Sequence, residues 1–269
     1  MIRPPAVAGT FYPDDSEALQ SMVSTMLAEA ADRNQVKPLM QPKAIIAPHA
    51  GYIYSGPVAA SVYALLEPFR DPIRRVVLLG PAHRVAFRGI ATTRADGYAT
   101  PLGRIEIDKA AIESLSSQPQ VMQLDEAHAN EHSLEVQLPF LQTVLSPGFT
   151  LIPLVVGDAT SDEVASVLNQ LWGGPETLIV ISTDLSHFHN YETATIRDQA
   201  TNLAIKTYSP QKISDADACG CRPLNGLLTI AKQKRLNIDV VDLRNSGDTA
   251  GPRDSVVGYA AYRLTEKTA

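Results

Sequence analysis

Three short apolar runs, each followed by a histidine or a carboxylate, constrain the fold of this chain more than any other feature. The runs cover residues 44–47, 76–79 and 177–183, and the polar groups that follow them are His49, His83, Asp184 and His187. Continuous apolar runs of this length are typical of strands that a sheet buries on both faces. In open α/β sheets, ligands bind at the carboxyl ends of such strands. The sequence therefore predicts one polar crevice to which all three runs contribute.

Helical and strand patterns alternate through most of the 269 residues. Apolar residues recur every three or four positions in several segments, which predicts helices there. We expect helices over residues 16–31, 57–66, 108–115, 133–145, 161–172, 191–208 and 223–232. This alternation favours an α/β fold with a central mixed, largely parallel β-sheet flanked by helices on both faces. No linker rich in glycine, serine or proline interrupts the chain, which predicts a single domain over residues 1–269.

Charge and composition argue against two classes of partner. The formal net charge is -6 and Lys and Arg are not clustered, so no nucleic acid is expected as a ligand. No apolar stretch approaches the ~20 residues that span a bilayer, so no membrane association is expected either. Cys219 and Cys221 stand one residue apart, a spacing that disfavours a disulfide between them. Free thiols are typical of a reducing compartment, which predicts a cytoplasmic protein.

His49 and His83 are the first candidates for a metal site. Each follows a predicted strand, and the carboxyl ends of neighbouring parallel strands lie ~5 Å apart, so two imidazoles can reach one ion. Asp184 stands three residues before His187 and either orients that imidazole or binds the metal itself. Taken singly, each residue has a plainer alternative as a loop histidine or as the N-cap of the next helix.

Cys219 is a further candidate because it precedes a predicted helix start. A helix N-terminus favours the thiolate, which binds metals and attacks electrophiles. The alternative is a small buried side chain that packs as an apolar residue, which is common for free cysteine. From the residues alone both interpretations stay open.

Two other histidine patterns carry less weight. Residues 128–132 match H-x-x-E-H, an inverted zinc-peptidase pattern. Because Ser133 is the expected N-cap of the following helix, both histidines precede that helix, and we interpret the match as coincidental. Glu131, His132 and Glu135 are nevertheless candidates for lining the crevice. His189 has no evident partner and is expected at the surface.

Six motifs together resemble the Memo family, whose prokaryotic members are often called AmmeMemoRadiSam system protein B. The motifs are Pro48-His49-Ala50-Gly51-Tyr52 with Tyr54-Ser55-Gly56, Gly80-Pro81-Ala82-His83, Glu131-His132-Ser133 with Glu135, Ser182-Thr183-Asp184-Leu185-Ser186-His187, Cys219-Gly220 with Pro223, and Asp254-Ser255-Val256-Val257-Gly258-Tyr259-Ala260. They occur in the family's order, and the likeness runs from the arm at residues 4–12 to Tyr262.

The resemblance implies a fold similar to the class III extradiol (LigB-like) dioxygenases, which use non-haem Fe(II). It also implies metal ligands at His49, His83 and Cys219, with Asp184 and His187 beside them. The extradiol enzymes hold iron with two histidines and one carboxylate, whereas here Cys219 takes the carboxylate position. A thiolate is softer, so Fe(II) is expected with copper or zinc as alternatives, and dioxygenase activity does not follow from the fold. The family also implies a functional link to a radical SAM protein and an AMMECR1-like protein.

Two functions of different class follow from these residues. The first is a mononuclear non-haem iron or copper redox enzyme, in which Asp184 completes the ligands or orients water. In that enzyme His187 is the general base and Tyr54 a hydrogen-bond donor. The second is a non-catalytic protein that binds a peptide or small molecule in the crevice at the strand ends. A zinc hydrolase with the same ligands is a third alternative. The sequence does not predict the substrate or the oligomeric state.

Overall fold

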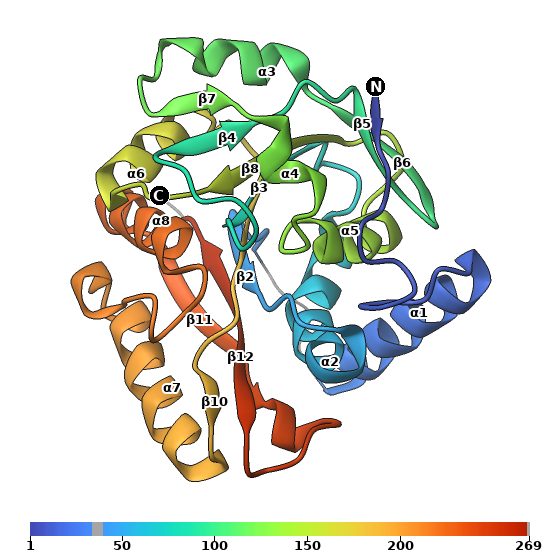
Figure 1. Ribbon diagram of the computed structural model, residues 1–269, viewed down its shortest axis with the longest axis vertical. Helices are drawn as coiled ribbons and strands as arrows, with labels where there is room; N and C mark the ends of the chain where they lie inside the picture. Colours follow the sequence, from blue (N-terminus) through green and yellow to red (C-terminus); the bar gives the residue numbers. More distant parts are fainter. Residues whose placement is uncertain (34–39, 268–269) are drawn as a thin grey trace.

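One mixed sheet of twelve strands forms the centre of the computed structural model, which describes residues 1–33 and 40–267 (Figure 1). Its middle contains β8 (Thr150–Val156), β3 (Arg75–Pro81), β9 (Thr177–Ser182) and β2 (Ala44–Ala47), side by side in this order and all parallel. These strands consist largely of valine, isoleucine and leucine and are buried almost throughout. Parallel strands covered on both faces have this composition because neither face meets water.

Further strands, most of them antiparallel to the central four, extend the sheet at both edges; β6 is parallel to β8. β12 (Val256–Thr265) pairs with β2, and β11 (Asn237–Asn245) and β10 (His187–His189) both pair with β12. On the other side, β6 (Gly103–Ile107) lies beside β8, followed by β5 (Gly97–Thr100) and β1 (Ile2–Arg3). β4 (Ile90–Thr92) pairs with β8 and with β7 (Val121–Gln123). Strands from both ends of the chain therefore join the same sheet.

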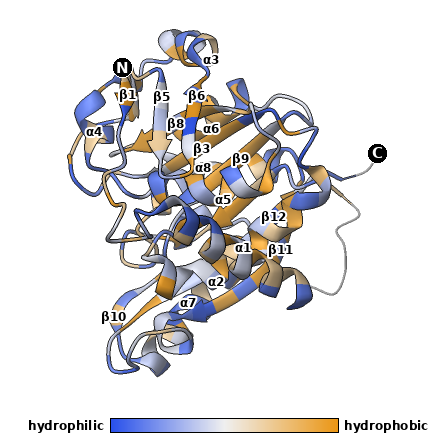
Figure 2. Cartoon of the chain, turned by 90° about the vertical axis from the view of Figure 1, so that its right-hand side faces the viewer, coloured by the Kyte–Doolittle hydropathy of each residue, from blue (hydrophilic) through white to orange (hydrophobic). Residues whose placement is uncertain are grey.

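Helices cover both faces of the sheet (Figure 1). One face packs against α1 (Ser16–Arg33), α2 (Tyr52–Tyr63) and α5 (Leu138–Val144), and the other against α6 (Ser161–Gln170), α7 (Tyr191–Lys206) and α8 (Cys221–Gln233). The short helices α3 (Lys109–Ser114) and α4 (Asp125–Ala129) lie near β4 and β7. Figure 2 shows apolar residues concentrated in the central strands, between these helix layers. The predicted fold class is confirmed: a single α/β fold with a mixed, mostly parallel sheet flanked by helices.

Two helices start about five residues away from the sequence expectation, whereas the boundaries of the other predicted helices differ by no more than two residues. The helix expected at residues 57–66 begins at Tyr52, because the Tyr52 N–H donates to the Phe11 carbonyl, a long-range contact that no local pattern reveals. The helix expected at 133–145 is split into a 3₁₀ turn, Glu135–Gln137, and α5, which begins at Leu138. Proline at position 139 explains this start, since its missing N–H is tolerated only in a first turn.

The order of the strands also corrects one premise of the sequence argument. β2 and β3 are not neighbours, because β9 lies between them and pairs with both. Their carboxyl ends are thus two strand spacings apart, roughly 10 Å, rather than one. β9, the strand that leads to Asp184 and His187, lies between the strands that lead to His49 and His83. In the described parts of the chain, no helix combines the length and hydropathy that crossing a membrane requires.

Candidate metal centre

Hydrogen bonds behind His49 fix its imidazole and leave one nitrogen free. Nδ1 lies 2.8 Å from Ser182 Oγ, which donates to the Ser133 carbonyl and accepts from Gln137 Nε2. A hydroxyl has a single proton, and Ser182 gives it to Ser133, so Nδ1 of His49 must carry the proton of this contact. The Nε2 lone pair is then available to a metal ion. It lies 3.2 Å from Cys219 Sγ.

His83 is oriented in the same way by a carboxylate. Its Nδ1 lies 2.8 Å from Glu131 Oε1, and its backbone N–H donates to Oε2 at 2.6 Å. Burial opposes ionisation of Glu131, but hydrogen bonds from His83 and Ser133 outweigh it and lower the pKa of Glu131 to about 2. An ionised carboxylate only accepts, so Nδ1 of His83 donates and its Nε2 is also free. Histidines that bind metals are commonly held in this manner.

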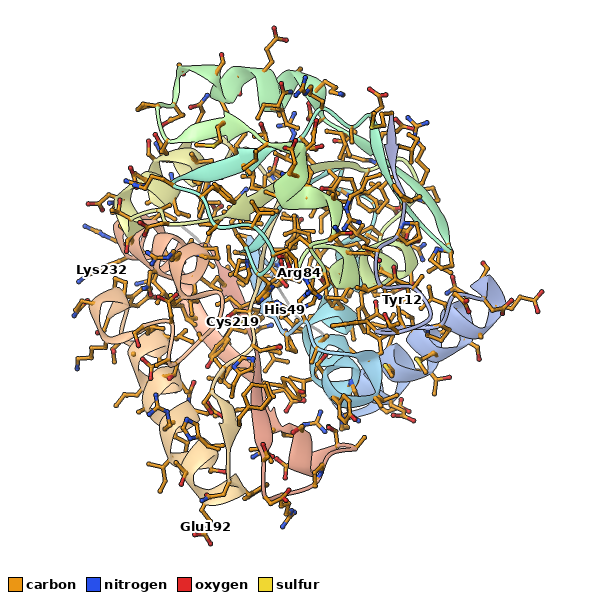
Figure 3. All side chains as sticks on the ribbon, in the orientation of Figure 1. Tyr12, His49, Arg84, Glu192, Cys219 and Lys232 are labelled. Atoms are coloured by element: carbon orange, nitrogen blue, oxygen red, sulfur yellow. The ribbon has the colours of Figure 1, made fainter. Side chains whose placement is uncertain are left out.

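Cys219 and Asp184 approach His49 from the other side. The Asp184 backbone N–H donates to Cys219 Sγ at 3.3 Å, and Asp184 Oδ1 accepts from the His49 backbone N–H at 2.7 Å. Asp184 Oδ2 lies 4.0 Å from His49 Nε2. A Cβ on Gly220 would lie 2.7 Å from the Ser182 carbonyl oxygen, so only glycine lets the segment that carries Cys219 pack this closely on β9. Figure 3 shows Cys219 and His49 close together near the middle of the molecule.

The ligand atoms form two overlapping groups that share His49. One comprises His49, Asp184 and Cys219, the other His49, His83 and His132, and within each group the atoms lie within 4.8 Å of one another. The His83 and His132 rings stack with centroids 4.7 Å apart, and those of His49 and His83 are 5.2 Å apart. The structure thus brings His83 and Cys219 each into a group with His49, but not into the same group, and the role of the three residues as ligands of one ion stays a prediction. His132, proposed only as a lining residue, is also close enough to bind.

Burial dominates the electrostatics of this centre. It lowers the pKa of His49 well below its usual value and that of His132 to about 4, so both imidazoles are neutral near pH 7. Burial also raises the pKa of Asp184 to about 7 and that of the Cys219 thiol above its ordinary value. A bound cation reverses this effect on acids, because its charge compensates the buried carboxylate and thiolate. Neutral imidazoles beside two acids in need of a counter-charge fit a metal ion.

A cavity of about 530 Å³ opens beside the centre. It is lined by His83, His187, His189, Arg197, Asp215, Ala216 and Cys219. His187 therefore lies where the sequence placed it, on the same crevice as two proposed ligands. His189 is half-buried and also lines the cavity, which the sequence did not predict. β10 carries His187 and His189, and both line the cavity. A strand of three residues is too short to be recognised from the periodicity of the sequence.

Other expected site residues lie elsewhere. Tyr54 is 37% exposed on α2, and within the described residues its hydroxyl has no hydrogen-bond partner and is not part of the cavity lining. Glu135 does not line the crevice, because it is fully buried in an ion pair with Arg3. His128 lies away from both ligand groups and bonds to Tyr98 and the Ala91 carbonyl, so the H-x-x-E-H match is indeed not a two-histidine metal pattern.

Comparison with known proteins shows to which family the chain belongs. A family model described as "Memo-like protein" matches residues 3–263. The chain belongs to this family. A MEMO1 family protein of Aquifex aeolicus is 37% identical over 270 residues, which cover 96% of this chain and 97% of that protein. A second, from Nitrosopumilus maritimus, is 30% identical and covers 98% of this chain and 100% of its own length.

The Memo-like fold also has a neighbour among solved structures. The crystal structure of an uncharacterized protein from Escherichia coli K12 superposes with a TM-score of 0.53 at 13% sequence identity. The match covers 82% of this chain and 98% of that one. At this identity the likeness concerns the fold alone. The family resemblance seen in the sequence is confirmed, and the chemistry of this Memo-like site must be argued from its own residues.

Proposed function

We propose that this chain binds one metal ion through His49, His83 and Cys219 and acts as a mononuclear non-haem iron or copper redox enzyme. The observation that supports the proposal is that His49, whose Nε2 lone pair is available, is shared by one ligand group with His83 and another with Cys219, beside the carboxyl ends of β2, β3 and β9. One ion bound by all three residues requires a side-chain adjustment that brings His83 and Cys219 closer together. Each histidine has its Nδ1 proton committed to Ser182 or Glu131. Structural histidines have no need of two such matched orientations.

The donor set indicates which metals fit. Two imidazoles and one thiolate suit iron, copper or zinc rather than magnesium or calcium, which prefer oxygen ligands. Bound iron or copper supplies redox chemistry and Lewis acidity to a small substrate in the cavity. The thiolate ligand distinguishes this centre from sites made of two histidines and one carboxylate, and so favours a different reaction.

The surrounding side chains supply proton transfer and orientation. Asp184, held by the His49 N–H, is placed to complete the ligands or to orient a water molecule. Burial lowers the pKa of His187, which keeps its imidazole neutral near pH 7 and able to accept a substrate proton as a general base. Tyr54 does not line the cavity, so the proposed role of its hydroxyl as donor applies only to a substrate that extends beyond the cavity to α2.

Metal content tests this proposal. We expect protein purified without chelator to contain close to one iron or copper per chain, and His49→Ala and Cys219→Ser to lose most of it. Cys221→Ser is the matched control, because Cys221 is a buried neighbour that bonds to Asp215 and belongs to neither ligand group. Unchanged metal in both site variants contradicts the ligand assignment. Zinc as the sole metal contradicts the redox proposal and favours the hydrolase.

A non-catalytic binding protein is the second candidate, and one observation favours it. Phe188, on the cavity strand β10, exposes 77% of its surface and is available as an apolar contact for a bound ligand. This candidate predicts that a peptide or small molecule binds equally well after complete metal removal. Binding that falls in proportion to metal content excludes it.

A further inference from the structure

We propose that the cavity beside the metal centre binds a small organic carboxylate, and that Arg197 binds its carboxylate group. The inference rests on the proposed function for the metal side of the cavity and adds the chemical class of the ligand. His83 and Cys219 form one part of the cavity lining and Arg197 belongs to the same lining. A ligand in this space can therefore meet the metal centre and the guanidinium together.

Arg197 is held in place but only partly used by the protein. Its Nη2 donates to the Ala216 carbonyl at 3.1 Å and to Asp217 Oδ1 at 3.0 Å. Asp217 is itself fixed, because its other oxygen accepts from the backbone N–H and the hydroxyl of Ser214. Among the described residues, Nε and Nη1 of Arg197 have no hydrogen-bond partner. Since Nε is covered by neighbouring atoms, Nη1 is the nitrogen left for a ligand.

Charges around the cavity favour a monoanion over a more highly charged group. Asp215 also lines the cavity, but it accepts from the Cys221 thiol and pairs with Arg222 at 3.6 Å. A phosphate dianion bound to Arg197 would be repelled by the carboxylates of Asp215 and Asp217, and this repulsion would weaken its binding. A carboxylate carries one charge and accepts the Nη1 hydrogens with good geometry. A volume of about 530 Å³ suits a small molecule.

The strand that contributes His187 and His189 to the cavity lining has a strained backbone at Phe188. The pairing of β10 with β12 shifts register between His187 and His189, and Phe188 between them has a φ of 61°. A large residue in the left-handed region is unfavourable and persists only where the surroundings enforce it. His187 and His189, on either side of Phe188, both line the cavity. Two polar donors thus stand in the same lining as Arg197.

Matched pairs of acids and amides test the inference. Pairs such as benzoate with benzamide and glycolate with glycolamide differ only in the charged group. Ligand-observed NMR on metal-free protein and on the zinc-loaded form measures their binding, and the folding of every variant is checked by circular dichroism. We expect acids to bind at least tenfold more tightly than their amides, and Arg197→Gln to abolish this preference. Arg197→Lys should restore part of it.

Arg88→Gln is the matched control, because Arg88 also holds an ion pair, with Glu163, but neither residue is among the lining residues. The acid preference must survive in this variant. Equal binding of acids and amides, no binding of any pair, or a preference that persists in Arg197→Gln overturns the inference. Binding to the metal-free protein reports the contribution of Arg197 without any contribution from a metal ion. The metal content of Arg197→Gln is measured in parallel. A failed metal assignment is therefore distinguished from a failed carboxylate assignment.

Discussion

Single residues act in this protein largely through the groups that hold them. Ser182 belongs to no ligand group, yet its hydroxyl sets the proton on His49 through bonds to Ser133 and Gln137. Glu131 has the same relation to His83. Neither residue could be assigned this role from sequence, because the contacts join segments 48 or more positions apart. The strand-end motifs, by contrast, were enough to select His49 and His83.

Ser182→Ala tests the orientation of His49. Without the hydroxyl, either ring nitrogen can carry the proton and the ring is free to rotate, so metal affinity should fall about 10–100-fold. Titration with a competing chelator measures the change. Ser186→Ala is the control, since Ser186 is equally buried, its backbone N–H keeps its bond to Asp198, and it belongs to neither ligand group. Equal losses in both variants would show that packing rather than orientation is responsible.

His128 gives stability a pH dependence. Burial lowers its folded-state pKa to about 4, while the unfolded chain has the ordinary value near 6.5. The unfolded state therefore binds more protons below pH 6.5, and stability falls as the pH drops from 6.5 toward 4, by about 3 kcal/mol from this group. Urea unfolding of wild type and His128→Gln at pH 7.5 and 4.5 isolates the contribution of His128 to the pH dependence of the free energy of unfolding. Identical pH slopes for the two proteins contradict it.

At the scale of elements, local sequence patterns predicted which helices and strands form but not which strands pair with each other. The apolar runs at β2, β3 and β9 and the helical spacing of α1, α6 and α7 were sufficient for the fold class. The insertion of β9 between β2 and β3 depends on tertiary packing and leaves no local signal. β10 and β7 are only three residues long, so neither offers a measurable period. For that reason the sequence did not predict that His189 lines the cavity.

The end of α8 offers a test of backbone strain. Arg235, exposed and with a φ of 56°, follows a helix whose closing bonds run from Leu236 N to Ala231 O and from Arg235 N to Lys232 O. Glycine is preferred at this position of such a cap. Arg235→Gly should raise the free energy of unfolding by about 1 kcal/mol, measured by denaturant titration. Lys232→Gly, inside α8, should lower it by a similar amount. A loss in both variants contradicts the strain argument.

At the scale of the whole molecule, the N-terminal arm is tied to the site by one buried carboxylate. Glu135 accepts from the Arg3 guanidinium, the Tyr12 hydroxyl and the backbone N–H groups of Ala6 and Val7. The arm then brings Phe11 against His132, with ring centroids 4.7 Å apart. The family resemblance extended to this arm, but the ion pair that anchors it joins residues 132 positions apart.

Removing this anchor should affect both stability and order. Glu135→Gln leaves Arg3 buried without its counter-charge, so we expect a loss of about 3–5 kcal/mol and faster amide exchange over residues 4–12. Adding Arg3→Met to Glu135→Gln should recover part of the stability, because the unpaired charge is gone. A double variant less stable than the single one would contradict a charge-based explanation.

X-ray absorption at the metal edge tests the central claim most directly. For protein loaded with iron or copper, we predict one sulfur scatterer at about 2.3 Å and nitrogen scatterers at about 2.0–2.1 Å, distances typical of thiolate and imidazole ligands. The sulfur should disappear in Cys219→Ser and persist in Cys221→Ser. A wild-type spectrum with only nitrogen and oxygen scatterers would contradict the account, because Cys219 would then not bind the metal.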